Sequence, residues 1–85
     1  MSSIIYEVIL KRHPGGNKPS VIHFYDEDRD VAIKAMKLYD KKNGFTLVED
    51  GHRFSIADIV LRARSVPDYD VVSETSFHEI DELMR

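Results

Sequence analysis

The segment at residues 4–11 constrains the fold more than any other stretch of the chain. Its side chains alternate with a period of two and are rich in β-branched and aromatic residues, which is typical of a β-strand. The first face is apolar throughout, and Ile5 and Ile9 make the second face partly apolar as well. We therefore expect a central strand, or a strand covered on both sides.

The length of the chain sets the size of the core that this strand can join. A chain of 85 residues is one domain. It buries only about 60% of the surface that its unfolded form exposes, so its stability is expected to be a few kcal/mol, about 3–5. A core this small leaves little room for a deep, dry active site. We expect a protein that is not an enzyme.

The absence of cysteine excludes several kinds of chemistry. Disulfides, zinc sites built on thiolates and cysteine nucleophiles are ruled out. Small secreted domains usually rely on disulfides, so we expect a cytoplasmic protein. The first residues lack the basic and long apolar regions of a signal peptide, and no apolar stretch approaches the ~20 residues that span a bilayer.

A second strand and a helix follow the first strand. Residues 21–25 predict a strand that forms a hairpin with residues 4–11, joined by a long loop with two prolines and a Gly-Gly-Asn run. Acidic residues at the start, two lysines at the end and Gly44 beyond them predict a helix at residues 28–42. The expected apolar stripe consists of Val31, Ala32, Ala35, Met36, Leu38 and Tyr39.

Residues 45–48 and 52–54 predict a second hairpin, and the segment after it is ambiguous. As a strand, residues 55–63 place Ala57, Ile59, Leu61 and Ala63 on one face. As a helix, Ile56, Ile59, Val60 and Ala63 have helical spacing, and Ser55 with Asp58 resembles a capping box. We favour a helix at residues 56–64, although β-branched residues disfavour it.

The chain is expected to end with a strand at residues 69–74 and a short helix. Phe77, Ile80 and Met84 would form the buried stripe of that helix. The expected order is ββαββαβα. The short connections favour an α+β domain, with a mainly antiparallel sheet and helices on one face.

Motifs for catalysis or cofactor binding are missing. The four histidines form no metal-binding motif. His23, flanked by apolar strand residues, is expected to be a hydrogen-bonded structural histidine, although a small enzyme or ligand binder using His23 or His52 stays an alternative. The loop at residues 14–18 lacks the spacing of a phosphate loop. We expect no metal and no cofactor.

Two basic sets are candidates for binding a partner. The first is the hairpin tip, and the second lies in and after the second hairpin. These candidates are Lys11, Arg12, His13 and Lys18 in the first set, and Arg53, Arg62 and Arg64 in the second. Together they could hold a nucleic-acid backbone, although on a helix Arg62 and Arg64 would splay apart. The net charge of −3 counts against nucleic acid as a non-specific partner.

The acidic end of the chain is the other candidate surface. Residues 65–85 carry six acids against Arg85. Glu79, Asp81 and Glu82 of the last helix would dock on a basic protein, if they are more than a solvated face. A homodimer is also expected to be feasible, with Ile33 as an exposed contact.

These features together favour a small interaction protein that acts by binding another protein. A small nucleic-acid-binding regulator is the alternative. The chain is short and cysteine-free and lacks a catalytic motif. In this general character it is similar to small proteins of phages and mobile elements. That class includes inhibitors of host defence such as anti-CRISPR proteins, and the similarity implies inhibition through a protein partner.

Overall fold

The strand that the first residues predict lies in the middle of a sheet. The computed structural model describes residues 3–83, and the side chains of residues 3–80. The elements are, in chain order, β1 (Ser3–Lys11), β2 (Val21–Asp26), α1 (Arg29–Asn43), β3 (Thr46–Glu49), β4 (His52–Ser55), β5 (Asp58–Val66), β6 (Val71–Ser76) and α2 (Phe77–Leu83). β1 has a neighbour on each side, in the sheet order β2-β1-β5-β6, and β3 and β4 form a separate two-stranded ribbon. All pairs are antiparallel.

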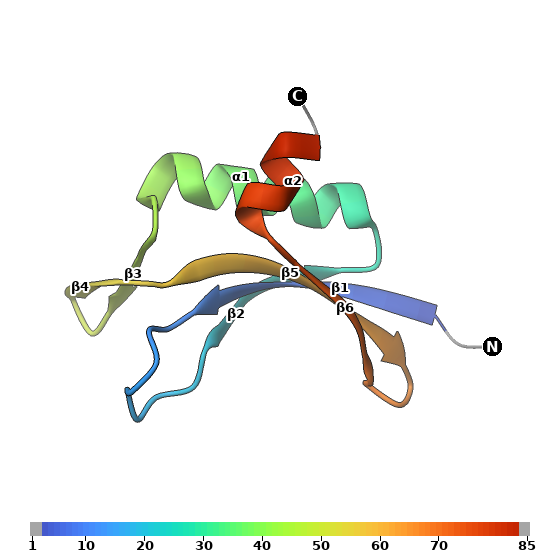
Figure 1. Cartoon of the computed structure of the whole chain (residues 1–85), viewed down its shortest axis with the longest axis horizontal. Helices are drawn as coiled ribbons and strands as arrows, with labels where there is room; N and C mark the ends of the chain where they lie inside the picture. The colour runs from blue at the N-terminus through green and yellow to red at the C-terminus, as the bar shows by residue number, and fades with distance from the viewer. Residues whose placement is uncertain (1–2, 84–85) are drawn as a thin grey trace.

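Both helices cover the same face of the four-stranded sheet, as Figure 1 shows. The covered face of β1 is the apolar face of the sequence, and Val8 and Leu10 are fully buried there. Ile59 and Leu61 of β5 lie directly opposite them in the sheet register. Met36 of α1 and Ile80 of α2 complete this core. The expected α+β architecture, with a mainly antiparallel sheet and helices on one face, is confirmed.

The ends of α1 follow the sequence signals, and its buried stripe follows them only in part, at Ala32, Met36 and Tyr39. Asp28 is the N-cap, and its carboxylate accepts a hydrogen bond from the backbone N–H of Asp30. Gly44 ends the helix with φ at +61°, which favours glycine. Ile33 was expected outside and is only 2% exposed, whereas Leu38 was expected inside and is 52% exposed. The expected dimer contact at Ile33 is therefore wrong.

The helix expected at residues 56–64 is wrong, because that segment is the strand β5. β5 pairs with β1 along its full nine residues, from Lys11 opposite Asp58 to Ser3 opposite Val66. β1 carries apolar side chains on both faces. β5 matches it, because Ile59 and Leu61 lie on one face of the sheet and Val60 lies on the other. The observed order is therefore ββαββββα, with the strand β5 in place of the expected second helix.

The end of the chain needs a smaller correction. The last strand begins at Val71, two residues later than expected, because Tyr69 and Asp70 belong to the turn between β5 and β6. α2 begins where the capping residues indicate, with Phe77 and Ile80 packed against the core. Met84 of the expected stripe lies outside the described residues. No helix in the described part of the chain has the length and apolarity to cross a membrane.

Candidate functional site

The face of the sheet that the helices leave uncovered carries the densest arrangement of functional groups. We call it the open face. The register defines three rows of side chains across it, because residues directly opposite each other in paired strands share a face. The rows are Ile22, Ile9, Val60 and Ser76; Tyr25, Glu7, Arg62 and Glu74; and Ile5, Arg64 and Val71. The loop between β1 and β2 and the turn between β5 and β6 both extend on this side (Figure 1).

Ion pairs cross the middle of the open face. Glu74 receives Lys11 at 2.8 Å and Arg62 at 3.2 Å. The hydrogen bond from Lys11, together with the nearby charge of Arg62, holds the pKa of Glu74 below its usual value against an opposing effect of burial. Lys11 lies on β1 and Glu74 on β6, so their contact spans β5. Ile9 and Val60 are buried on this face, although neither helix covers it.

A second ion pair joins the floor of the open face to the turn between β5 and β6. Arg64 Nε donates to Glu7 Oε1 at 2.6 Å, and Arg64 Nη1 donates to the carbonyl oxygen of Tyr69 at 2.8 Å. Glu7 is the buried charged residue of the described chain, at 6% exposure. A carboxylate this deeply buried requires a cation as a partner. Arg64 satisfies it and anchors the turn with the same guanidinium group.

Tyr69 has an uncommon backbone conformation in that turn. Its φ is +62°, in the left-handed region that bulky residues rarely occupy. Besides the bond from Arg64, its backbone N–H donates to the carbonyl of Ser65 at 2.7 Å. The ring nevertheless remains 55% exposed. These contacts therefore hold a strained residue while leaving its aromatic ring open to solvent, a combination that is more common at binding sites.

A hollow of about 320 Å³ lies at this end of the open face. We call it the tyrosine pocket. Its lining residues are Ile5, Glu7, Ile22, Tyr25 and Tyr69. Tyr25 is 66% exposed and Ile22 is 52% exposed, so the walls of the pocket are available for contact. Val71 and Val72 of β6, at 51% and 59% exposure, extend the exposed apolar surface along the edge strand.

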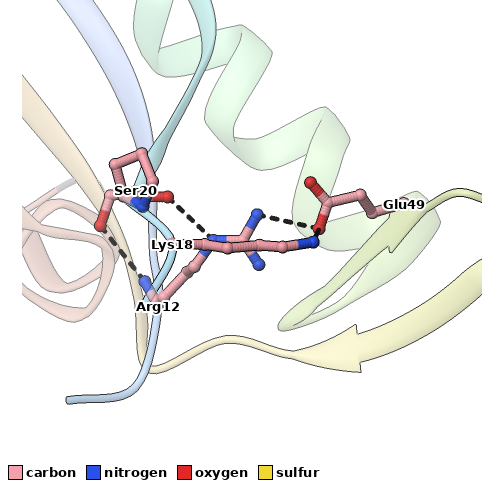
Figure 2. Close-up of polar contacts among 5 residues, drawn as sticks. Arg12, Lys18, Ser20 and Glu49 are labelled. Carbon is pink, nitrogen blue, oxygen red and sulfur yellow. Dashed lines mark hydrogen bonds and ion pairs between the residues drawn. The ribbon is translucent and has the colours of Figure 1, made fainter. Parts of the chain in front are cut away.

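The basic hairpin tip is bound to an acid instead of being free. Arg12 and Lys18 both contact Glu49 Oε2 at the end of β3, at 3.1 Å and 3.3 Å (Figure 2). Arg12 also donates from Nε to the carbonyl of Pro19 at 2.8 Å. The hydrogen bond from Lys18, followed by that from Arg12, lowers the pKa of Glu49. His13 is exposed in the loop. Arg12 and Lys18 thus attach the loop to the β3–β4 ribbon.

The second basic set is divided between two places. Arg62 and Arg64 lie on one strand two residues apart, so they share the open face and do not splay as a helix would require. Lys11 of the first set joins them there through Glu74. Arg53 lies on the exposed β4 strand of the ribbon. The structure therefore brings Lys11, Arg62 and Arg64 together and leaves Arg53 elsewhere.

The acidic candidates of α2 are only partly described. Glu79 is exposed in the first turn of the helix, as expected for a solvated face. Asp81 and Glu82 lie outside the residues whose side chains the structure describes. The acid that does organise a surface is Glu74, which precedes the helix and pairs with cations of the sheet.

His23 lies on the other side of the sheet, in a second hollow. That hollow, of about 280 Å³, lies between β2 and α1 and is lined mainly by apolar groups such as Phe24 and Leu38. The ring of His23 meets Tyr39 edge-on, with the ring centroids 4.5 Å apart, and partial burial lowers the pKa of His23. Among the described residues, no group of three or more His, Asp or Glu side chains is placed to hold a metal ion.

Sequence reasoning missed the most important residues of the open face. Glu7, Tyr25 and Tyr69 were not candidates. The sequence does contain a signal for Glu7, which lies between Ile5 and Ile9 on the partly apolar face of the first strand. A single acid in such surroundings needs a cation from a neighbouring strand as its partner. Tyr69 was assigned to a strand, which concealed its turn conformation.

Comparisons of the chain with protein-family models, with curated proteins and with solved structures found no match.

Proposed function

We propose that this chain is a non-enzymatic protein-binding module and that the open face is its binding surface. The observation that carries the proposal is the set of exposed apolar side chains along that face. They are Ile22, Tyr25, Tyr69, Val71 and Val72, each more than half exposed. Tyrosines and aliphatic residues gathered on one exposed face are typical of protein interfaces, where tyrosine is also enriched at the energetic centre.

The dimensions of the open face suit such an interface. Four strands, six to nine residues long, make up the sheet. With strands about 4.8 Å apart and a rise of about 3.3 Å per residue, the flat area is roughly 400–600 Å². Because side chains project from the sheet, the solvent-accessible area of the open face is larger than this flat area. A standard interface buries about 800 Å² on each partner, so the open face with its two flanking loops approaches one partner's share.

The charges of the open face favour a protein over a nucleic acid. Lys11, Arg62 and Arg64 lie on the face, but each pairs with Glu7 or Glu74. A phosphate backbone would have to compete with these carboxylates for every cation. The two exposed tyrosines could stack on bases, which keeps single-stranded nucleic acid as the alternative that the experiment must separate.

Binding through the open face is compatible with inhibition of a protein partner, the role that the general character of the sequence implies. A small module that docks through one sheet face can block a functional surface of its partner without chemistry of its own. A second copy of this chain is another occupant of the open face, and a measured dimer mass that the Ile22→Lys substitution abolishes would identify it.

The test uses two substitutions that are matched in exposure and charge. Ile22 on the open face and Leu38 on α1 are both 52% exposed, so Ile22→Lys and Leu38→Lys add the same charge at equally exposed apolar sites. Tagged wild-type chain and both variants are used to capture partners from lysate of the source cells, with and without nuclease. A captured protein is then purified, and its affinity for each variant is measured directly.

We expect nuclease-resistant capture by the wild-type chain and by Leu38→Lys. Ile22→Lys should weaken the affinity by about tenfold or more, since an interface residue whose loss costs about 1.4 kcal/mol has that effect. Equal weakening by both variants would contradict the open face as the binding surface. Capture that disappears with nuclease and weakens steeply with salt would establish nucleic-acid binding in its place.

A further inference from the structure

The tyrosine pocket has the composition of a site for a positively charged side chain. We propose that it receives a lysine or arginine of the partner protein, which inserts from the solvent side of the open face. This inference rests on the proposed function, because it names the chemistry of the partner's anchoring residue. The pocket is lined by Ile5, Glu7, Ile22, Tyr25 and Tyr69.

The walls of the pocket suit a cation on an apolar stem. Tyr25 and Tyr69 are 66% and 55% exposed, so their rings are available to a guest. The face of a tyrosine ring attracts an ammonium or guanidinium group through its quadrupole. Ile5 and Ile22 provide apolar contact, which the methylene chain of lysine or arginine can use while the charged end lies at a polar group.

The charge at the pocket favours a basic guest that shares a carboxylate with Arg64. Glu7 is the charged residue among the lining residues. Its carboxylate accepts one hydrogen bond at Oε1, from Arg64 Nε. An ionised carboxylate has about four lone-pair sites, so it can accept further donors. Arg64 is not a lining residue, so a guest meets the carboxylate and the tyrosine rings. A basic guest would share Glu7 with Arg64, as Lys11 and Arg62 share Glu74.

The conformation of Tyr69 shows how the pocket is held in shape. Its left-handed φ of +62° is held by hydrogen bonds to its backbone N–H and carbonyl. The carbonyl bond comes from Arg64, which also holds Glu7. One guanidinium group therefore sets both the carboxylate floor and one aromatic wall. A site organised in this way before binding loses less entropy when a guest enters.

The volume of the pocket is sufficient for one long side chain. At about 320 Å³ it is near the lower end of ligand pockets, which span roughly 300–1,000 Å³. It lies open to solvent on the same face as the exposed Val71, so a guest that is part of a larger protein can enter while its neighbours contact the sheet. A basic side chain would then act as the anchor of the interface.

The experiment titrates the whole chain with two probes that differ in charge and share a four-carbon stem. They are Nα-acetyl-lysine amide and Nα-acetyl-norleucine amide, with Nα-acetyl-arginine amide and Nα-acetyl-glutamate amide as further probes. Binding is followed by NMR at the methyl groups of Ile5 and Ile22 and the rings of Tyr25 and Tyr69. We expect saturable shifts with the lysine and arginine probes, about five- to tenfold tighter than with norleucine, from the combined aromatic and carboxylate attraction.

Variants show whether the pocket is responsible. Tyr25→Leu should reduce the preference for the lysine probe over norleucine, because it removes an aromatic wall and retains an apolar side chain. The matched control is Phe54→Leu, at an aromatic that is 44% exposed on the β4 strand, which should leave the affinity unchanged. Glu7→Gln should abolish the preference for a cation, provided that the amide spectrum shows an intact fold.

Three results would overturn the inference. They are equal affinity for lysine and norleucine probes, tighter binding of the glutamate probe, and the absence of shifts at the two tyrosines. These outcomes are separable from failure of the proposed function. If Ile22→Lys abolishes partner binding and Tyr25→Leu does not, the open face binds the partner without a cation in the pocket. If both variants bind normally, the open face itself is not the binding surface.

Discussion

Arg64 connects the floor of the open face to the turn between β5 and β6. It donates to the buried Glu7 carboxylate and to the carbonyl of Tyr69, so one side chain supports the floor and the edge of the tyrosine pocket. Only arginine can do this, since its planar group offers several donors in fixed directions. Lysine at this position would supply one charged group at the end of a flexible stem.

We predict that Arg64→Met lowers the free energy of unfolding by about 2 kcal/mol, because hydrogen bonds to charged groups contribute roughly 1.5–3 kcal/mol and the Glu7 carboxylate would remain buried without its partner. Urea denaturation followed by circular dichroism measures the change. The comparison is Arg62→Met, which should cost less than about 1 kcal/mol, since Glu74 is more exposed and keeps Lys11 as its partner.

A double variant separates the cost of an unpaired charge from the value of the pair. Replacing both partners, in Glu7→Leu with Arg64→Met, should recover much of the stability lost in the single variant, because a buried ion pair can often be replaced by apolar residues without loss. Equal losses in Arg64→Met and Arg62→Met would show that the burial of Glu7 does not govern the effect.

At the scale of elements, Glu49 links the β3–β4 ribbon to the loop between β1 and β2, although the ribbon shares no strand pairing with the main sheet among the described residues. The ribbon of β3 and β4 pairs only with itself among the described strands, whereas the loop between β1 and β2 belongs to the main sheet. Arg12 and Lys18 in or next to that loop both contact Glu49 (Figure 2). Glu49 therefore limits the movement of the ribbon relative to the loop.

We predict that Glu49→Gln loosens the loop at residues 13–19 while leaving the sheet intact. The neutral amide keeps the shape of the side chain but loses the charge that two cations share. Amide hydrogen exchange should become faster in that loop and stay unchanged in β1 and β5. The matched control is Glu79→Gln, on the exposed side of α2. Unchanged loop exchange in Glu49→Gln would show that the loop is held by other contacts, such as the bond from Arg12 to Pro19.

β5 is the element that sequence analysis assigned wrongly, and the reason is physical. Ile56, Ile59, Val60 and Ala63 have the spacing of a helix, whereas the apolar run at residues 59–61 fits a strand buried on both sides. Local periodicity cannot separate these two for a short apolar run. The choice depended on β1, which required a second neighbour and pairs with β5 over nine residues.

For the whole molecule, the titrating groups predict how stability depends on pH. Partial burial lowers the pKa of His23 from 6.5, and hydrogen bonds from cations lower the pKa of Glu49 and Glu74 from 4.5. In each case the unfolded chain binds protons more readily than the folded chain, so stability falls as the pH is lowered. The fall should begin below pH 6.5 with His23 and steepen below pH 4.5 with the carboxylates.

Tyr39 limits stability at the alkaline end. Burial raises the pKa of Tyr39 above 10.0, against an opposing effect of Arg53. Above pH 10.0 the unfolded chain therefore releases the tyrosine proton more readily than the folded chain, so stability falls as the pH rises. Urea midpoints measured from pH 4 to pH 11 should therefore be highest between about 6.5 and 10. In His23→Phe the plateau should extend downward toward pH 4.5. A fall between pH 6.5 and pH 5 that persists in this variant would exclude His23 as its source.

The sequence by itself determined the elements whose signals are local. The central position of β1 follows from its two apolar faces, and the ends of α1 follow from Asp28 and Gly44. The α+β class and the placement of helices on one face follow from the order and the short connections. The absence of cysteine thiol chemistry follows from composition alone. Each of these features depends on residues close together in the chain.

Only the tertiary structure decided how the strands pair and therefore which side chains meet. Arg64 and Glu7 are 57 residues apart in the chain and form the shortest ion pair of the described residues. A shift of one residue in the register would move every side chain of β5 to the other face, so no local pattern could place Arg64 beside Glu7. The tyrosine pocket depends on the same register, because it joins β1, β2 and the turn after β5.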